Sequence, residues 1–357
     1  MVKGRGAASN RTGRYEPLVR VAVDDGWNVS PDDDGDSRTR WRDDAARSII
    51  TNNDSPDLHF DRSVNPYRGC EHGCIYCYAR PSHAWLGHSP GLDFERLLYV
   101  KRDAPALLRK AFAARGYAPQ PICLGTVTDA YQPLERQLRI TRQLLEVFVD
   151  CRHPVLLITK SSLVERDLDL LRDLAADDLV SVTITITTLD NALSRRLEPR
   201  ATAPQRRLRT LETMAGAGIP TRLSLSPVIP ALNEPEIDTI VQAAADAGAL
   251  EANAIMLRLP HELSALFQEW LAEHYPDRAA RVMKAIRSVR DGQDNDADFG
   301  TRMLGTGPRA DIIRQRFTLA CRRAGILAGR RPVTLDTTRF RPPVVARPGQ
   351  QRQLGLF

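Results

Sequence analysis

Over residues 155–187 the chain reads VLLITKSSLVERDLDLLRDLAADDLVSVTITIT. The apolar run Val155–Thr159 is typical of a buried strand, and the leucines over 168–174 recur at helical spacing. The stretch ends in a β-branched run, Val182–Thr187, which again favours a strand. Strand, helix and strand in this order predict a βαβ unit, whose two strands lie parallel in one sheet.

The same alternation extends in both directions from this unit. Further strands are predicted at Ile122–Leu124, Arg222–Leu225 and Ala254–Leu259, and a first short strand just before Cys70. The total of about six units falls short of the eight that close a full barrel. The sequence therefore predicts an α/β fold that is either a partial barrel or a doubly wound sheet. Both place functional residues at the carboxyl ends of the strands.

The chain divides into four segments by composition. Residues 1–55 mix Gly, Ser, Asn, Asp and Arg without a sustained apolar period, which predicts irregular or disordered structure. Residues 56–260 carry the alternation of strands and helices and form the predicted core. Amphipathic helices are predicted over 261–326, and a flexible Pro- and Arg-rich tail over 327–357.

The composition limits the function classes. With 42% hydrophobic and 26% charged residues in 357, the chain is typical of globular proteins. No apolar run approaches the roughly 18 residues of a membrane span, and none follows the charged start, so we expect no membrane segment, no secretory signal and a cytoplasmic location. The net charge of +6 is uneven, since Arg302–Phe357 holds twelve arginines against two aspartates. This favours an acidic partner such as DNA, although solvated surface charge explains it equally well.

Three of the six cysteines stand together in Cys70-Glu71-His72-Gly73-Cys74-Ile75-Tyr76-Cys77. Thiolates at C-x-x-x-C-x-x-C spacing can hold three irons of a [4Fe-4S] cluster and leave the fourth iron open to a small molecule. A zinc site is the alternative, with His72 or His83 as the fourth ligand. The place of the triplet, on a loop that opens the βα series, favours the cluster.

The motif resembles that of the radical S-adenosylmethionine enzymes, C-x-x-x-C-x-aromatic-C, with Tyr76 as the aromatic residue. The resemblance implies a partial (β/α)6 barrel. It also implies that the open iron binds the amino and carboxylate groups of S-adenosylmethionine and that one electron cleaves the sulfonium. The resulting 5′-deoxyadenosyl radical would abstract a substrate hydrogen. An electron donor such as flavodoxin or ferredoxin is then implied as a partner.

Further motifs resemble the branch of these enzymes related to spore photoproduct lyase, over about residues 48–260. They are Asn65–Cys70, Cys77–Arg80, Thr128–Glu135, Thr159–Ser161 and Ser226–Pro230. The start, Lys3–Ala7, is similar to that of an uncharacterised bacterial subgroup of the branch. The resemblance implies lyase-like or other radical chemistry, in DNA repair.

The resemblance also implies a site for S-adenosylmethionine. Tyr76, between two cluster ligands, would cover the adenine. Thr128 and Asp129 would accept a hydrogen bond from the amino group, and Lys160 would pair with the carboxylate. The alternatives are a turn residue that caps the next helix, for Asp129, and a solvated strand end, for Lys160.

Three more residues are implied near this site. Glu198 and Arg200 follow the fourth strand and would contact the ribose or the carboxylate. Tyr78 would relay a hydrogen atom, unless it is a packed tyrosine with a satisfied hydroxyl. Spore photoproduct lyases carry a hydrogen-donating cysteine three residues before the aspartate that matches Asp129, and here that position is Thr126. The sequence therefore does not support photoproduct repair by that route.

Two other functions stay open beside a radical enzyme that acts on nucleic acid. One is radical chemistry on a protein or a small metabolite. The other is a non-enzymatic, DNA-associated adaptor in which the cysteines bind zinc and stabilise the loop.

The last residues, Gln353-Leu354-Gly355-Leu356-Phe357, resemble the peptide by which bacterial repair proteins dock on the sliding clamp. Three apolar side chains at a free end can enter an apolar groove while Gln353 makes a polar contact. We expect the clamp as a partner on this ground. The alternative is a terminus that folds back onto the barrel.

Overall fold

The computed structural model describes residues 4–16, 38–329 and 334–343. Its largest element is an eight-stranded sheet with the order β11-β10-β9-β8-β7-β6-β3-β2. Seven neighbouring strands of this sheet are parallel: β11 (Leu327–Ala328) at its edge and the six barrel strands, which are β3 (Arg62–Val64), β6 (Ile122–Leu124), β7 (Val155–Thr159), β8 (Val180–Thr185), β9 (Thr221–Val228) and β10 (Glu251–Met256). They follow one another in chain order, whereas a doubly wound sheet reverses at a switch point. The predicted partial (β/α)6 barrel is therefore confirmed.

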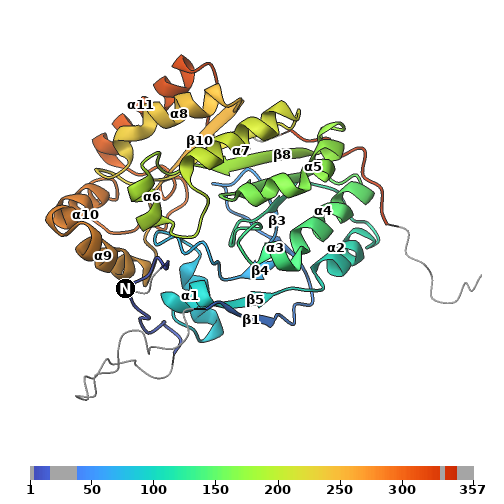
Figure 1. Ribbon diagram of the computed structural model, residues 1–357, viewed down its shortest axis with the longest axis horizontal. Helices are drawn as coiled ribbons and strands as arrows, with labels where there is room; N and C mark the ends of the chain where they lie inside the picture. The colour runs from blue at the N-terminus through green and yellow to red at the C-terminus, as the bar shows by residue number, and fades with distance from the viewer. Residues whose placement is uncertain (1–3, 17–37, 330–333, 344–357) are drawn as a thin grey trace, which may run out of the picture.

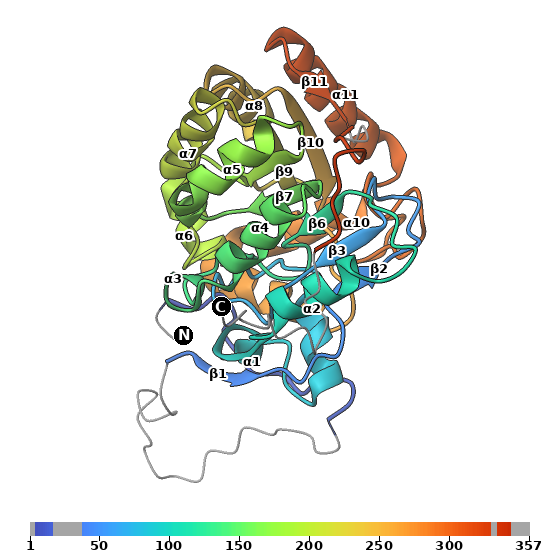
Figure 2. The ribbon, with the colours of Figure 1, turned by 90° about the vertical axis from the view of Figure 1, so that its right-hand side faces the viewer.

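Helices cover the outer side of this sheet (Figures 1 and 2). They are α2 (Ala104–Phe112), α4 (Ile140–Asp150), α5 (Leu168–Ala175), α7 (Pro204–Gly216), α8 (Ile237–Asp246) and α11 (Gly307–Arg323). Side chains alternate along the strands. Val155 and Leu157 of β7 belong to the large core shared with the helices, and Leu156 packs on the other side with Cys123.

A three-stranded sheet of order β1-β5-β4 lies beside the barrel (Figure 1). Its strands are β1 (Arg40–Asp43), β4 (Tyr67–Arg68) and β5 (Leu97–Val100). The loop with the three cysteines runs from β4 to the 3-10 helix η1 (Arg80–Leu86), and α1 (Leu92–Arg96) leads back into β5. Because β4 follows directly on β3, the loop starts at the carboxyl end of the first barrel strand.

The described part of the N-terminal segment, residues 4–16 and 38–55, is more ordered than its composition predicts. Residues 1–55 are expected to be irregular, yet β1 lies within them and β2 (Ile50–Asn52) pairs with β3. Arg5, Gly6 and Ala7 are buried. The order comes from contacts with distant parts of the chain, which leave no periodic pattern in the segment itself.

The C-terminal part contains the expected helices, α9 (Leu263–His274), α10 (Ala279–Arg287) and α11, and then β11 (Leu327–Ala328), which pairs with β10. The described residues 334–343 also pack on the barrel. The Phe340 ring lies 5.5 Å from that of His153, and the Arg341 N–H donates to the Cys151 carbonyl at 2.8 Å. The described residues of the predicted flexible tail, 327–329 and 334–343, are therefore packed, and the rest of it lies outside the described residues. Among the described helices, none combines the length and hydropathy needed to cross a membrane.

Candidate active site

The three clustered cysteines lie on the loop that leads from β4 to η1. Cys70 and Cys74 are buried, Cys77 is half-buried, and all three thiols are free. Burial raises the pKa of Cys74 to about 12, and the nearby Glu198 carboxylate adds to the effect. A bound metal counters such a shift, since cysteine ligates as the thiolate and releases its proton on binding.

One arginine, Arg80, holds the backbone of this loop. Its buried side chain donates hydrogen bonds to the carbonyl oxygens of Cys74 (2.8 Å) and Gly73 (3.0 Å). It also donates to the carbonyl oxygens of Pro90 (3.1 Å) and Gly91 (2.9 Å). The loop contains only turns and no regular hydrogen-bond ladder, so these bonds add to the few others that hold its backbone.

Glu95 balances the charge of Arg80. Both side chains are fully buried, and Arg80 lies 2.5 Å from the Glu95 carboxylate. The same carboxylate accepts the backbone N–H groups of Gly6 and Ala7, each at 2.9 Å. The N-terminal segment and the cysteine loop are thereby joined through one buried ion pair.

We expect Gly6→Ala to displace the N-terminal segment from the cysteine loop. A Cβ at Gly6 would lie 1.8 Å from the Gly73 carbonyl oxygen, which is closer than two such atoms can approach. The free energy of unfolding should fall by about 1–3 kcal/mol, as for other overpacked sites, and retained iron should fall with it. Gly216→Ala is the control, because a Cβ there meets nothing within 4 Å. Equal iron content and equal melting temperature in both variants would contradict this contact.

Both histidines considered as zinc ligands are engaged elsewhere. His72 Nδ1 lies 3.4 Å from a carboxylate oxygen of Asp129, and His83 Nε2 lies 2.8 Å from the Leu97 carbonyl oxygen. Burial lowers the pKa of His83 to about 4. In the part of the chain that the structure describes, no three His, Cys, Asp or Glu side chains are grouped to hold one metal ion. A [4Fe-4S] cluster needs no such grouping, because each thiolate binds a different iron, and the three-thiol donor set fits it.

The Asp129 carboxylate accepts several hydrogen bonds from other groups of the chain. Its Oδ1 accepts hydrogen bonds from the Thr159 hydroxyl (2.7 Å) and the Tyr131 N–H (2.8 Å). Its Oδ2 accepts from the Lys160 N–H (2.7 Å) and faces His72. Burial raises the pKa of this carboxyl, but His72 and the hydrogen bonds outweigh it and hold the pKa well below its ordinary value. These contacts give Asp129 a positioning role, and its contact with S-adenosylmethionine stays a prediction.

Lys160 lies directly after β7, beside the cysteine loop. Its Nζ is 5.9 Å from the centroid of the Tyr76 ring, and its charge lowers the pKa values of Cys74 and Glu198. The described residues provide no hydrogen bond or ion pair to this ammonium group. A half-buried cation that has no hydrogen-bond or ion-pair partner among the described residues is suited to bind the carboxylate of a ligand. The role of Lys160 stays a prediction, and its position supports it.

Glu198 belongs to a buried network that holds Tyr76. Its carboxylate accepts hydrogen bonds from the Tyr76 hydroxyl and, at 2.8 Å, from the Thr187 hydroxyl, and forms an ion pair with Arg207. Burial raises the pKa of Glu198, but Arg207 and Lys160 outweigh it and bring the pKa to about 2. With its carboxylate committed to these partners, Glu198 supports Tyr76, and the expected ribose contact stays untested.

Arg200 has ion-pair and hydrogen-bond partners within the chain, whereas the Thr128 hydroxyl has none among the described residues. The Arg200 guanidinium lies 3.2 Å from a carboxylate oxygen of Glu71. The backbone N–H of Arg200 donates to the His72 carbonyl, so Arg200 helps to hold the cysteine loop. The Thr128 hydroxyl is buried and has no hydrogen-bond partner among the described residues. A buried polar group of this kind calls for a ligand or a water. Thr128 therefore retains its predicted place in the cofactor site.

Tyr78 follows Cys77 and is 47% exposed. Its hydroxyl donates to the carbonyl oxygen of Thr126, whose own hydroxyl accepts a hydrogen bond from Asn65 at 3.1 Å. Tyr78 and Thr126 are thus neighbours beside the cysteine loop. That Tyr78 relays a hydrogen atom stays a prediction.

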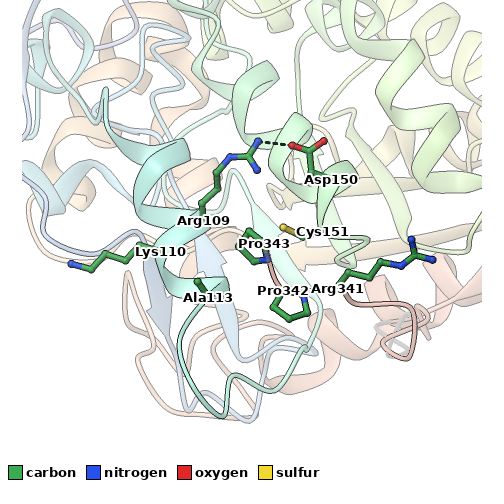
Figure 3. Close-up of a pocket in the computed structure, with 8 residues that line it drawn as sticks. All are labelled: Arg109, Lys110, Ala113, Asp150, Cys151, Arg341, Pro342 and Pro343. Atoms are coloured by element: carbon green, nitrogen blue, oxygen red, sulfur yellow. Dashed lines mark hydrogen bonds and ion pairs between the residues drawn. The ribbon is translucent and has the colours of Figure 1, made fainter. Parts of the chain in front are cut away.

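Two cavities are found elsewhere, and neither is lined by the cysteine loop. One, of about 760 Å³, lies between α2, α4 and residues 341–343 (Figure 3). In it Arg109 is paired with Asp150 at 2.5 Å. The other, of about 480 Å³, is lined by Arg139, Arg142, Arg166 and Asp169. Charge pairing within both cavities favours solvated surface clusters over reactive sites.

Comparisons with known proteins agree with this geometry. Residues 64–244 match the family described as the radical SAM superfamily. An uncharacterised protein of Mycobacterium tuberculosis (strain H37Rv) is 32% identical over 232 residues, 64% of this chain and 68% of that protein. An uncharacterised protein of Methanocaldococcus jannaschii is 31% identical over 173 residues, 48% of this chain and 62% of that protein.

Solved structures of spore photoproduct lyase share the fold. The lyase complexed with dinucleoside spore photoproduct superposes with a TM-score of 0.56 at 16% identity, over 81% of each chain. A mutant with bound AdoMet and the same dinucleoside superposes with a TM-score of 0.53 at 14% identity, over 77% of this chain and 78% of that chain. At these identities the likeness concerns the fold.

The family match spans about half of the chain and includes the three clustered cysteines, Asp129 and Lys160. A non-enzymatic zinc adaptor is therefore set aside. The chain belongs to the radical SAM superfamily, as an enzyme whose cofactors are a [4Fe-4S] cluster and S-adenosylmethionine.

Proposed function

We propose that this enzyme holds its cluster with Cys70, Cys74 and Cys77 and abstracts a hydrogen atom from nucleic acid, in DNA repair. The observation that carries the proposal is the place of the cysteine loop. It starts at the carboxyl end of the first barrel strand, and Arg80 clamps its backbone. In parallel α/β folds, catalytic groups and substrates meet at this edge.

Different residues of the chain bind different groups of S-adenosylmethionine. Lys160 binds the carboxylate, and the unpartnered Thr128 hydroxyl accepts from the amino group. Tyr76, held by Glu198, presents its ring to the adenine. Asp129 positions Lys160 through the backbone. When bound, the cluster and S-adenosylmethionine supply the electron and the 5′-deoxyadenosyl radical that removes the substrate hydrogen.

We expect Lys160→Ala to weaken the binding of S-adenosylmethionine while the iron content stays unchanged. A charge-assisted contact is worth about 1.5–3 kcal/mol, so the affinity should fall about tenfold or more. Equilibrium dialysis on anaerobically reconstituted enzyme measures it. Lys160→Arg keeps the charge and should restore part of the affinity, and Lys110→Ala, on the exposed side of α2, is the control. Unchanged affinity in Lys160→Ala would show that Lys160 only lies at a strand end.

Three observations support nucleic acid as the substrate class. A solved structure with this fold holds dinucleoside spore photoproduct. The segment Arg302–Phe357 is strongly basic, which suits phosphate, and it ends in a clamp-like peptide. Thr126 stands where the lyases carry their hydrogen-donating cysteine, so we infer a reaction other than photoproduct repair by that route.

Deuterium transfer tests the substrate class. Reduced enzyme is incubated with S-adenosylmethionine and perdeuterated DNA that carries lesions, and the 5′-deoxyadenosine is analysed by mass spectrometry. We expect deuterium in this product, because the hydrogen that leaves the substrate ends on the 5′ carbon. Enrichment from perdeuterated protein or metabolite extract, with none from DNA, would contradict the proposal and support the alternative substrate classes.

The reaction also needs an external electron. We infer a flavodoxin or a ferredoxin as the donor, in the cytoplasm.

We infer further that Gln353, Leu354, Leu356 and Phe357 dock the enzyme on the bacterial sliding clamp. These residues lie outside the described part of the chain. The segment before them, 334–343, hydrogen-bonds to Asp178 and Cys151, which precede β8 and β7. It therefore lies at the amino ends of the strands, opposite the cysteine loop.

A peptide ending at Phe357 is expected to bind purified clamp at micromolar strength, about −8 kcal/mol. Leu356→Ala combined with Phe357→Ala should abolish this binding, because both apolar anchors are lost. Fluorescence anisotropy measures it. No binding by either peptide, or equal binding by both, would remove clamp docking from the account.

A further inference from the structure

Arg258 lies across from the cysteine loop. It follows β10, two residues after Met256, and so stands at the carboxyl end of the sixth parallel strand. Its guanidinium carbon is 4.9 Å from the centroid of the Tyr78 ring, and Tyr78 is the residue after Cys77. The first and last barrel strands thus bring a tyrosine and an arginine together beside the cluster site.

The Arg258 guanidinium lacks the partners that other buried arginines of this chain have. Arg80 and Arg207 are each paired with a glutamate, and Arg290 donates to the carbonyl oxygens of Met256 and Leu257. For Arg258, which is half-buried, the described residues supply no hydrogen bond and no ion pair. Partial burial of an unpaired charge costs free energy, and a bound anion would recover it.

The surroundings of Arg258 are positive. Burial and the charge of Arg302 both lower the pKa of Arg258, although Tyr78 and Asp57 act in the opposite direction. Asp57 is already paired with Arg302, at 2.6 Å. Arg290 donates its hydrogen bonds to carbonyl oxygens, and the charge of Asp296 acts on it, so three arginines (Arg258, Arg290 and Arg302) stand against two aspartates (Asp57 and Asp296). The local field therefore attracts an anion.

Two exposed aromatic rings flank these arginines. Tyr78 is 47% exposed and Phe299 is 57% exposed, and the Arg302 guanidinium carbon lies 4.4 Å from the centroid of the Phe299 ring. Each ring has an arginine over one face, and each side chain stays about half exposed. Accessible aromatic rings beside positive charge are the combination that binds unstacked bases and their phosphates, and here the charge of Arg258 has no ion partner among the described residues.

We propose that Arg258 binds a backbone phosphate of a single-stranded or locally unpaired nucleic acid, whose bases stack on Tyr78 and Phe299. The inference rests on the proposed function, since it takes nucleic acid as the substrate and gives it a place at the barrel mouth. It adds the residues that hold the substrate. A duplex with stacked bases cannot use the two rings, so an unpaired stretch is required.

The test is binding of a short, fluorescein-labelled oligothymidylate to the full-length, anaerobically reconstituted enzyme, followed by anisotropy. Arg258→Gln is expected to weaken binding about tenfold and to reduce the slope of log affinity against log salt by about one. Phe299→Ala should weaken binding about fivefold or more through lost stacking. Arg172→Gln, an exposed arginine on α5, is the matched control and should change neither quantity.

Competitors identify the ligand chemistry. Unlabelled oligothymidylate should displace the probe, and duplex DNA, thymidine monophosphate and inorganic phosphate should do so far less well. Equal competition by duplex would overturn the stacking part, and equal competition by monophosphate would point to a small metabolite and overturn the nucleic-acid part. Equal oligothymidylate affinity in Arg258→Gln and Arg172→Gln would overturn the role of Arg258.

Iron content and melting temperature of each variant show whether it folds. The same preparation is assayed for 5′-deoxyadenosine without any nucleic acid. Wild-type enzyme that forms this product and does not bind the oligonucleotide overturns the proposal for Arg258 and leaves the radical chemistry standing. The deuterium experiment then decides the substrate class independently.

Discussion

Cys74→Ala is expected to abolish cluster assembly and with it all cleavage of S-adenosylmethionine. Two thiols remain on the loop in this variant, and a cluster held at three of its irons loses one anchor. No nearby histidine can substitute, because His72 faces Asp129 and His83 faces Leu97. Iron and sulfide analysis after anaerobic reconstitution, together with chromatography of 5′-deoxyadenosine, measures both effects.

The matched control is Cys321→Ala. Cys321 is a free, buried cysteine in α11, far along the chain from the cysteine loop, and its loss removes a similar volume. Its iron content should equal that of the wild type. A Cys74→Ala variant with full iron and undiminished cleavage would contradict the assignment of the three ligands.

Arg80→Met is expected to cost about 3–5 kcal/mol of unfolding free energy, because it leaves the Glu95 carboxylate buried without its ion partner. It also removes the hydrogen bonds that fix the carbonyl groups of Gly73 and Cys74, so the remaining folded protein should lose iron faster to a chelator. Urea unfolding gives the first quantity, and release of iron over time gives the second.

A second ion pair with the same N–O distance, but exposed to solvent, shows how much of the loss in unfolding free energy is due to burial. Arg109 lies 2.5 Å from Asp150, with side chains 44% and 54% exposed, whereas Arg80 and Glu95 are both 0% exposed at the same distance. Arg109→Met should therefore cost less than about 1 kcal/mol. Similar losses in the two variants would mean that the Arg80 pair does not support the loop as described.

The barrel strands are predictable because their information is local, and the three cysteines stand out as proposed ligands for the same reason. Each strand is a short apolar or β-branched run between helical stretches, as in Val155–Thr159, and neighbours in the sheet are neighbours in chain order. The ligand spacing of Cys70, Cys74 and Cys77 is likewise contained in eight consecutive residues. Neither feature needs knowledge of distant contacts.

The supporting residues are not predictable in this way. Glu95 binds Gly6 across 89 positions, and Glu198 binds Tyr76 across 122 positions. In the sequence each is a single charged residue, which is typical of a solvated surface. Arg80 stands in a motif that resembles the family, but nothing in the sequence marks Glu95 as its buried partner.

Asp129 shows the limit of inference from a motif. The resemblance implies a contact with S-adenosylmethionine, which stays a prediction, but it does not reveal the four groups of the chain that surround the carboxylate, including the backbone N–H of Lys160. Phe340 shows the same limit in the tail. One aromatic residue in a Pro- and Arg-rich stretch does not predict that the segment packs on Phe112 and His153.

Metal analysis combined with product analysis on one sample tests most directly whether the enzyme holds a [4Fe-4S] cluster and cleaves S-adenosylmethionine. The full chain is reconstituted anaerobically with iron and sulfide, reduced, and mixed with S-adenosylmethionine. We expect roughly four irons and four sulfides per chain, a brown chromophore, and formation of 5′-deoxyadenosine that Cys74→Ala abolishes. A colourless protein with about one zinc per chain and no 5′-deoxyadenosine would contradict it.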